Sequence, residues 1–541
     1  MKISSTLLAI ALMGYSFLIQ AQTSWPESLI LTPEKSNFVK TSSHAEVMQF
    51  IDAIKQKTSN AHVFSMGKSL EGKEIPVIVL SNPIVKTPEE AKATGKMIIY
   101  IQGNIHAGEV EGKEAVMMLM RDILLGKKSN LLQNQIILFA PIYNTDSNDK
   151  MEKGRRPSQE DSPLEVGIRE NSQGLDLNRD GVKMEALETQ GLFNNIIATW
   201  DPQVFVDLHT TNGTWHAYSL TWAPSYHYAG ESGPYNYTVN QILKNVTGRM
   251  KSKYDLNIGP YGEYDLAEGW PPKNFYTYNH HPRYLVNQFG LRNRMAILSE
   301  AFSHERFYQR VHSTYSFASE ILEFTNEHAK EIQAVNKKAE DETIKNVTDN
   351  AGKVKKGVRF KMVPLEKIGS FPTYDYVSYT KPDGTPEYYR TGKIVRYNNV
   401  EYHAKFEAET ESTLPRGYII PAAFSAIAEN LKAHGVKVTT LEKSQRYEGE
   451  IFAIEKMDKS TRKFEGHFMA RASGKFSAAK RSFKKGDFMI DLAQPLGNLA
   501  FYLLEPESDD GLVTWNFFDA YFQEKSAGNK PVEYPVFKYY K

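Results

Sequence analysis

Four short runs in the first three hundred residues consist of apolar side chains without a break: 97–101, 136–140, 204–206 and 295–298. A strand with one solvent-facing side alternates apolar and polar residues, so an unbroken apolar run indicates a strand covered on both faces. Between these runs lie segments with helical apolar spacing, at 110–125, 184–199 and 236–252. This alternation predicts an α/β domain, with a mixed, mostly parallel open sheet and helices on both of its faces.

The chain changes character after this domain. Residues 22–325 carry the alternating pattern, whereas 326–357 are charged with few apolar positions, which is typical of a solvated helix that serves as a linker. Beyond it, 358–541 contain short aromatic and β-branched runs between Pro and Gly turns, with one helical pattern near 422–434. This composition predicts a smaller β-rich domain, whose role the sequence does not indicate.

The N-terminus has the pattern of a secretory signal peptide over residues 1–21. Lys2 is followed by an almost unbroken apolar stretch, Thr6–Ile19, and then by Ala21, a small residue suited to cleavage. The stretch is too short to span a bilayer and no later run reaches that length, so we expect no stable membrane anchor. The protein is therefore predicted to be exported, and so to be periplasmic or secreted.

Two features of the composition exclude whole classes of function. Lys and Arg total 65 against 64 Asp and Glu, so the chain offers no single-sign surface for binding nucleic acid. It has no cysteine, which excludes disulfides, thiolate nucleophiles and Cys-ligated metal sites. A metal site in this chain would therefore use His, Asp and Glu. The chain also has no Gly-x-Ser-x-Gly motif, which argues against a serine hydrolase.

Candidate metal ligands follow two of the buried strands. His106 and Glu109 come just after the first strand, and Asp207-Leu208-His209 continues from the third. Open α/β sheets place their ligands at the carboxyl ends of the strands, where these side chains would meet. Two His and one Glu are a typical ligand set of hydrolytic zinc sites.

A further carboxylate, Glu300, lies directly after the last apolar run. It could pair with a neighbouring cation such as Arg294. Beside a metal site, a carboxylate at this position could instead serve as a general base that removes a proton from water. The two interpretations differ in whether the carboxylate faces a substrate.

The sequence also contains Asn178 and Arg179 between the second and third predicted strands. An arginine beside an amide presents several parallel donors, which can bind a carboxylate. The alternative for Arg179 is a structural ion pair with Asp176 or Asp180.

Together these residues resemble the zinc carboxypeptidase family, the carboxypeptidase A-like metallopeptidases. The resemblance covers about 40–325 and rests on the order of the motifs: His-x-x-Glu, then Asn-Arg, then His, then Glu. The segment 67–73, Gly-Lys-Ser-Leu-Glu-Gly-Lys, is also similar to the family's early hairpin. The resemblance implies one zinc per chain, held by His106, Glu109 and His209.

The resemblance also implies how a substrate is handled. Glu300 matches the family's general base, and Asn178 and Arg179 match the pair that grips the free terminal carboxylate of a peptide. The arginine that polarises the scissile carbonyl is Arg155 or Arg156. We choose Arg156, because Arg-Pro-x-Gln after an Asn-rich turn resembles a bacterial branch of the family.

A tyrosine of the family's site should precede the general base, and three residues compete for this role: Tyr276, Tyr278 and Tyr284. We choose Tyr278 and expect 278–291 to line the specificity pocket. The chain departs from the family at two positions. Gly108 stands where the best-known members carry Arg, and Asp180 stands where their Asn-Arg is followed by Asn.

The sequence thus predicts a zinc metallocarboxypeptidase that hydrolyses the C-terminal peptide bond of peptides. One alternative keeps the metal and changes the substrate, to cell-wall stem peptides or acyl amino acids. Another is a non-catalytic binding protein on the same scaffold, with 358–541 as the binding module. The sequence does not choose the side-chain specificity or the oligomeric state.

Overall fold

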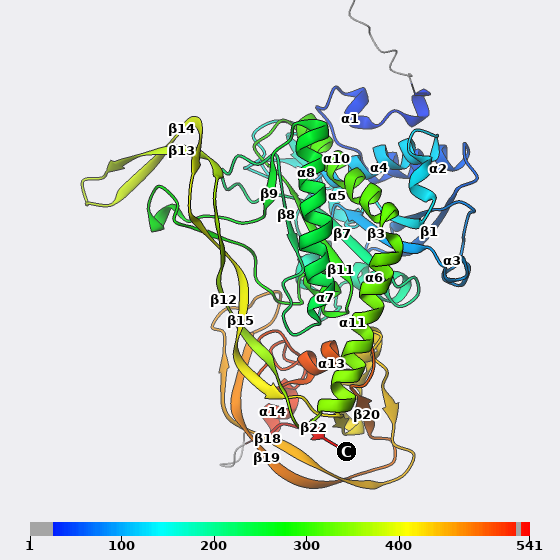
Figure 1. The fold of residues 1–541 in the computed structure, drawn as a ribbon, viewed down its shortest axis with the longest axis vertical. Coiled ribbons are helices and arrows are strands. Elements are labelled where there is room, and N and C mark those ends of the chain that lie inside the picture. Colours follow the sequence, from blue (N-terminus) through cyan, green and yellow to red (C-terminus); the bar gives the residue numbers. More distant parts are fainter. Residues whose placement is uncertain (1–24, 526–531) are drawn as a thin grey trace, which may run out of the picture.

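The computed structural model describes residues 25–525 and 532–541. Its main body is an eight-stranded sheet with the strand order β1-β2-β4-β3-β7-β11-β8-β9 (Figure 1). The strands of this sheet are β1 Ala61–Lys68, β2 Glu74–Leu80, β3 Met97–Gly103, β4 Gln135–Ala140, β7 Val204–Thr210, β8 Leu220–Pro224, β9 Ile258–Pro260 and β11 Met295–Ala301. The signal peptide predicted at 1–21 lies outside the described residues.

The sheet is mixed, with a parallel centre. Strands β4, β3, β7 and β11 run parallel to one another, while β1, β2 and β8 join antiparallel. The four runs that the sequence predicts as doubly covered strands are β3, β4, β7 and β11, and all of their residues are buried. The predicted α/β fold with a mixed, mostly parallel sheet is confirmed.

Alternate residues of each central strand enter two separate cores. In β3, Ile99 and Ile101 pack in the core on one face, whereas Ile98 and Tyr100 pack in the core on the other. The first face is covered by α2 His44–Lys55, α4 Glu111–Leu124, α8 Lys244–Tyr254 and α10 Phe307–Glu327. The second is covered by α3 Pro88–Thr94, α6 Leu187–Leu192 and α9 Leu285–Leu291. Shorter elements of this region are α1 Thr32–Lys35, α5 Thr145–Asn148, α7 Ser232–Tyr237, β5 Glu152–Lys153 and β6 Glu165–Val166.

The charged segment after the sheet forms a long helix, α11 Ala329–Asn350. Its charged side chains lie mainly on the exposed face. A stripe that includes Ala329, Ile332, Ala339 and Val347 is buried, because small and β-branched residues recur there at helical spacing. The helix is therefore packed along its length and leads from the sheet towards the C-terminal region (Figure 1).

The C-terminal region is rich in strands, as the sequence predicts. Its strands are β12 Lys355–Ile368, β13 Phe371–Thr380, β14 Pro386–Tyr397, β15 Val400–Thr413, β16 Gly417–Ile420, β17 Thr439–Thr440, β18 Gln445–Lys459, β19 Ala470–Phe483, β20 Phe488–Asp491, β21 Val532–Glu533 and β22 Phe537–Tyr539. Its helices are α12 Ser425–Ala433, α13 Gly497–Leu504 and α14 Asp519–Lys525. The predicted helix near 422–434 corresponds to α12.

This region shares structure with the α/β domain. Strand β10 Asn274–Tyr276 comes from the α/β part of the chain but pairs with β15 in a three-stranded sheet. The C-terminal core also contains Val182, Ala229 and Leu291 of the α/β domain. The two parts are therefore packed together. No helix among the described residues is both long and apolar enough to cross a membrane.

Candidate metal centre and active-site cavity

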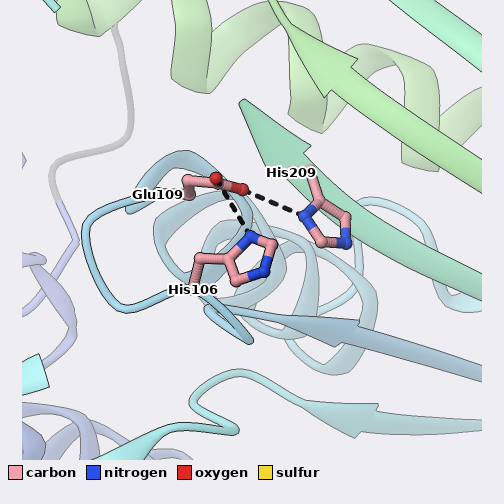
Figure 2. A group of neighbouring side chains, drawn as sticks. All are labelled: His106, Glu109 and His209. Atoms are coloured by element: carbon pink, nitrogen blue, oxygen red, sulfur yellow. Dashed lines mark hydrogen bonds and ion pairs between the residues drawn. The ribbon is translucent and has the colours of Figure 1, made fainter. Parts of the chain in front are cut away.

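The predicted metal ligands meet at the carboxyl ends of two neighbouring strands. His106 and Glu109 lie in the loop between β3 and α4, and His209 lies near the end of β7, which pairs in parallel with β3 (Figure 2). The loop is close to the sheet because Gly103 and Gly112 nearly touch: a Cβ at Gly103 would stand 2.7 Å from the carbonyl carbon of Gly112. Strand register and this close approach therefore bring the three side chains together.

The three side chains form one buried cluster around the Glu109 carboxylate. His106 Nδ1 lies 3.0 Å from Glu109 Oε1, and His209 Nδ1 lies 3.0 Å from Glu109 Oε2. One donor atom from each residue lies within 4.8 Å of the others. Two imidazole nitrogens and one carboxylate oxygen that converge in this way are suited to a zinc ion.

The outer nitrogen of each imidazole ring faces a second carboxylate. His106 Nε2 lies 3.1 Å from Asp176 Oδ1, and His209 Nε2 lies 3.0 Å from Asp207 Oδ2. Burial disfavours charge on His209, but Asp207 and Glu109 outweigh it and raise the pKa of the ring well above its ordinary value. Metal-binding histidines are commonly oriented by such outer carboxylates. The surroundings of the two rings therefore also fit a metal site.

The cluster opens into a cavity of about 370 Å³, which is lined by every site residue that the sequence predicts. These residues are His106, Glu109, Arg156, Asn178, Arg179, His209, Tyr278 and Glu300. The structure thus brings together side chains from six separate stretches of the chain. Of the alternatives, Tyr276 and Tyr284 also line the cavity, while Arg155 is paired with Glu152.

Glu300 lies beside the cluster on β11, in register with His209 of β7. Glu300 is only 8% exposed, and burial raises the pKa of its carboxyl group to about 8. In the described part of the chain, no side chain donates a hydrogen bond to this carboxylate, and Arg294 pairs with Asp201 and Glu340 instead. The geometry therefore favours a group that faces substrate over a structural ion pair.

Asn178 and Arg179 lie in the short 3₁₀ helix Leu177–Arg179. Arg179 makes no ion pair with Asp180, because Lys183 and two backbone amides occupy that carboxylate. Its nearest acid is Asp176, at 3.8 Å, and its guanidinium carbon lies 4.5 Å from the ring centroid of Tyr284. Arg179 therefore lines the cavity, but its Nη1 also donates to the Asn178 carbonyl oxygen at 2.9 Å and makes the ion pair with Asp176 that the sequence offers as the alternative.

Two arginines approach Glu109, in different ways. Arg156 donates to Glu109 Oε1 at 2.9 Å and to two backbone carbonyls, and its side chain is 15% exposed. Arg169, which the sequence reasoning missed, donates to Asp176 and remains 37% exposed at the cavity wall. Gly108 is required here, because a Cβ would stand 2.9 Å from Cγ of Arg156.

The three candidate tyrosines differ in what their hydroxyls contact. The Tyr278 hydroxyl donates to the Pro224 carbonyl at 3.2 Å and lies 3.2 Å from Asn287 Oδ1. The Tyr276 hydroxyl donates to Glu268. Tyr284 alone among them packs against Arg179. The role of Tyr278 stays a prediction. Of the three candidates, Tyr284 is the one in contact with Arg179.

A second His and Asp group lies where the α/β domain meets the C-terminal region. Donor atoms of His280, His281 and Asp509 also lie within 4.8 Å of one another. However, Asp509 Oδ2 accepts from the Phe360 amide at 2.9 Å, and its Oδ1 accepts from the Tyr502 hydroxyl. This carboxylate is thus already engaged by the protein, which distinguishes it from the cluster in the cavity.

The cavity contains a His-Glu-His donor set suited to a metal ion, and the comparisons with known proteins find carboxypeptidases. Residues 47–196 match the family model described as zinc carboxypeptidase. Carboxypeptidase 2 of Trichophyton tonsurans is 21% identical over 499 residues, which cover 87% of this chain and 81% of the relative. Carboxypeptidase D of Homo sapiens is 33% identical over 124 residues, which cover 22% of this chain and 8% of that protein.

Solved carboxypeptidase structures are also among the matches, at low identity. The crystal structure of a metallo-carboxypeptidase from Burkholderia cenocepacia is 15% identical, with a TM-score of 0.39, and the match covers 53% of this chain and 70% of that one. The resemblance to the zinc carboxypeptidases that the sequence predicts is confirmed by the family match and the relatives. The similarity to Carboxypeptidase 2 extends beyond the α/β domain into the C-terminal region.

Proposed function

We propose that this chain is an exported zinc metallocarboxypeptidase that removes the last residue of peptides with a free C-terminal carboxylate. One observation carries the proposal: a single cavity contains a buried His-Glu-His donor set, the Glu300 carboxylate, to which no described side chain donates a hydrogen bond, and the Asn178-Arg179 pair. The donor set would hold a metal that activates water, the carboxylate would transfer a proton, and the Asn-Arg pair would bind a terminal carboxylate. Export is supported by the pattern of the first 21 residues.

His106, Glu109 and His209 would hold one metal ion. When bound, the ion would supply a Lewis acid that polarises the scissile carbonyl and acidifies the attacking water. Asp176 and Asp207 would keep the two imidazole rings in the orientation that presents Nδ1 to the metal. The predicted ligand set is therefore supported by its donor chemistry and by the carboxylates around it.

Glu300 would move the proton. It takes a proton from the attacking water and later delivers it to the amine nitrogen of the departing residue, so the carboxylate is regenerated. A pKa near the working pH suits a group that must both accept and release a proton, and burial brings the pKa of Glu300 to about 8. Its place beside His209 puts it next to the reacting bond.

The arginines would divide the remaining work. Because Nη1 of Arg156 is occupied by Glu109 and Nη2 by backbone carbonyls, we assign Arg156 to orienting the ligand Glu109. Arg169 is more exposed, and its Nη1 lies 3.3 Å from His106 Nδ1; with that nitrogen on a metal, this donor would be free for the developing oxyanion, the role that the sequence predicts for Arg156. Asn178 and Arg179 would bind the terminal carboxylate through several parallel donors.

The proposal is tested by metal content and chelation. Purified protein should contain one zinc per chain by elemental analysis, and removal of the ion should abolish hydrolysis of a free-acid peptide until zinc is restored. Full activity in metal-free protein would overturn the proposal. Two ions per chain would instead point to His280, His281 and Asp509 as a second site.

A further inference from the structure

The segment 279–284, of which Asn279 and Tyr284 line the cavity, contacts the carboxylate clamp, Asn178 and Arg179. The ring of Tyr284 lies under the Arg179 guanidinium, 4.5 Å from its central carbon. Leu285, directly after the segment, donates its amide hydrogen to Asn178 Oδ1 at 3.0 Å. Both residues of the clamp are therefore held by this stretch of chain.

The backbone around the clamp is also packed closely against the segment. Gly181 donates its amide hydrogen to the carbonyl oxygen of Arg283 at 3.0 Å. A Cβ at Gly181 would stand 2.5 Å from the carbonyl oxygen of Pro282. At this distance the two stretches cannot move independently, so a displacement of 279–284 would be transmitted to the clamp.

The segment is fixed in turn by the C-terminal region. Asp510 is fully buried, and its carboxylate receives two hydrogen bonds from Arg283 and forms an ion pair with it. The Arg283 amide donates to Oδ2 and Nε donates to Oδ1, both at 2.8 Å, and Nη2 lies 2.6 Å from Oδ1. Trp515 Nε1 donates to the same Oδ1 at 2.9 Å. Asp510 therefore holds both the backbone and the side chain of Arg283.

Neighbouring residues of the C-terminal region reinforce this contact. The rings of Trp515 and Phe464 lie 5.0 and 5.2 Å from the Arg283 guanidinium carbon. Glu465 Oε2 accepts from the amide of Asp176, the residue that faces His106, at 3.0 Å. The C-terminal region thus reaches the cavity at two places.

We propose that Asp510 is a positioning residue for the carboxylate clamp: by fixing Arg283 it fixes Tyr284 and thereby Arg179, so the C-terminal region forms part of the substrate-binding site. The inference rests on the proposed function, because it assumes that Arg179 binds the terminal carboxylate. It gives the β-rich region a role that neither the sequence nor the comparisons assign.

The test is Asp510→Asn, which keeps the shape of the side chain but removes the charge that receives the Arg283 donors. The expected result is a fall of about tenfold in kcat/KM for free-acid peptides, chiefly through a higher KM. Values for the matching C-terminal amides should change little, so the preference for the free acid should shrink. Zinc content should equal that of the natural enzyme, because the metal ligands lie on other elements.

A matched control is Asp487→Asn. Asp487 is also a buried aspartate of the C-terminal region, and it accepts from the backbone amides of Ala422 and Lys484. Its substitution should affect folding stability without changing the acid-to-amide preference. If D487N reduced the preference as much as D510N, or if folded D510N kept the natural preference, the inference would be overturned.

A gentler variant, Trp515→Phe, covers the case in which D510N does not fold. It removes one donor to Asp510 but keeps an aromatic ring beside the Arg283 guanidinium and the hydrogen bonds from Arg283 to Asp510, so it should lower the preference in the same direction but less. An unchanged preference in folded W515F would then overturn the inference. Failure of the proposed function looks different: the natural enzyme itself would cut acids and amides equally.

Discussion

The metal-ligand cluster and the carboxylate clamp share one cavity but are positioned by different parts of the chain. The cluster stands at the ends of β3 and β7, so the hydrogen-bonded register of one sheet fixes it. The clamp lies on a short 3₁₀ helix and is held by a loop, which Asp510 of the C-terminal region holds in turn. Some mutations should therefore impair the chemical step alone, and others should impair the preference for a free C-terminal carboxylate alone.

The largest effect is expected at the strand-end part of the site. Glu300→Gln should lower kcat by about a thousandfold, because it removes the group that accepts and returns the proton. Zinc content should be unchanged, since Glu300 is not a ligand in the proposal. The measurement is kcat together with elemental analysis, and loss of the metal in E300Q would show that the role is wrongly assigned.

Substitutions of Arg169 and Arg156 should have different effects, one on kcat and the other on metal binding. Arg169→Ala should lower kcat by about a hundredfold, the effect of losing one donor to a developing oxyanion. Arg156→Ala should act mainly on metal binding, because Arg156 orients Glu109. Arg155→Ala is the control, since that side chain pairs with Glu152 outside the cavity. The reverse pattern, with R156A losing kcat and R169A unaffected, would restore the role that the sequence predicts for Arg156.

A smaller effect is expected at the outer carboxylates, which orient the imidazole rings of the metal ligands. Asp207→Asn should weaken zinc binding by about tenfold or more, because the outer carboxylate orients the ring of His209. Competition with a chelator of known affinity measures this change. Equal zinc affinity in the natural protein and D207N would mean that the backbone alone orients the ring.

The stability of the contact between the α/β domain and the C-terminal region should also depend on pH. His434 lies at this contact, with Nε2 3.1 Å from the Val182 carbonyl oxygen, and burial lowers the pKa of its ring to about 3. The unfolded chain takes up a proton near pH 6.5 while the folded protein does not. The stability that neutral His434 contributes is therefore present above pH 6.5 and lost as the pH falls towards 3.

This loss amounts to at most about 1.4 kcal/mol per pH unit. In His434→Gln, the free energy of unfolding should depend less on pH between 6.5 and 4 than in the natural protein. His328→Gln is the control, because that side chain is 35% exposed. Identical slopes in H434Q and the natural protein would remove His434 as the cause.

The sequence predicts the part of the site at the strand ends better than the part held by the C-terminal region. The unbroken apolar runs identify β3, β4, β7 and β11, and the polar residues at their ends give His106, Glu109, His209 and Glu300. These predictions rely on local pattern, because parallel strands end at a common edge of the sheet. The strand-end part of the cavity was therefore accessible from the sequence.

The remaining contacts depend on distant parts of the chain. Asp510 meets Arg283 across more than two hundred residues, and no local pattern marks such a pair. Arg169 sits in an irregular loop, where residue type alone does not tell which arginine faces the cavity. The pairing of β10 with β15 likewise requires the folded C-terminal region.

The most direct test of the account compares one peptide as the free acid and as the C-terminal amide. The natural enzyme should cut the amide at least about a hundredfold more slowly, because the buried donors of Asn178 and Arg179 are then left without their partner. Arg179→Ala should remove most of this preference, mainly by slowing the free acid. Equal rates for acid and amide with the natural enzyme would contradict the central claim that this cavity reads a terminal carboxylate.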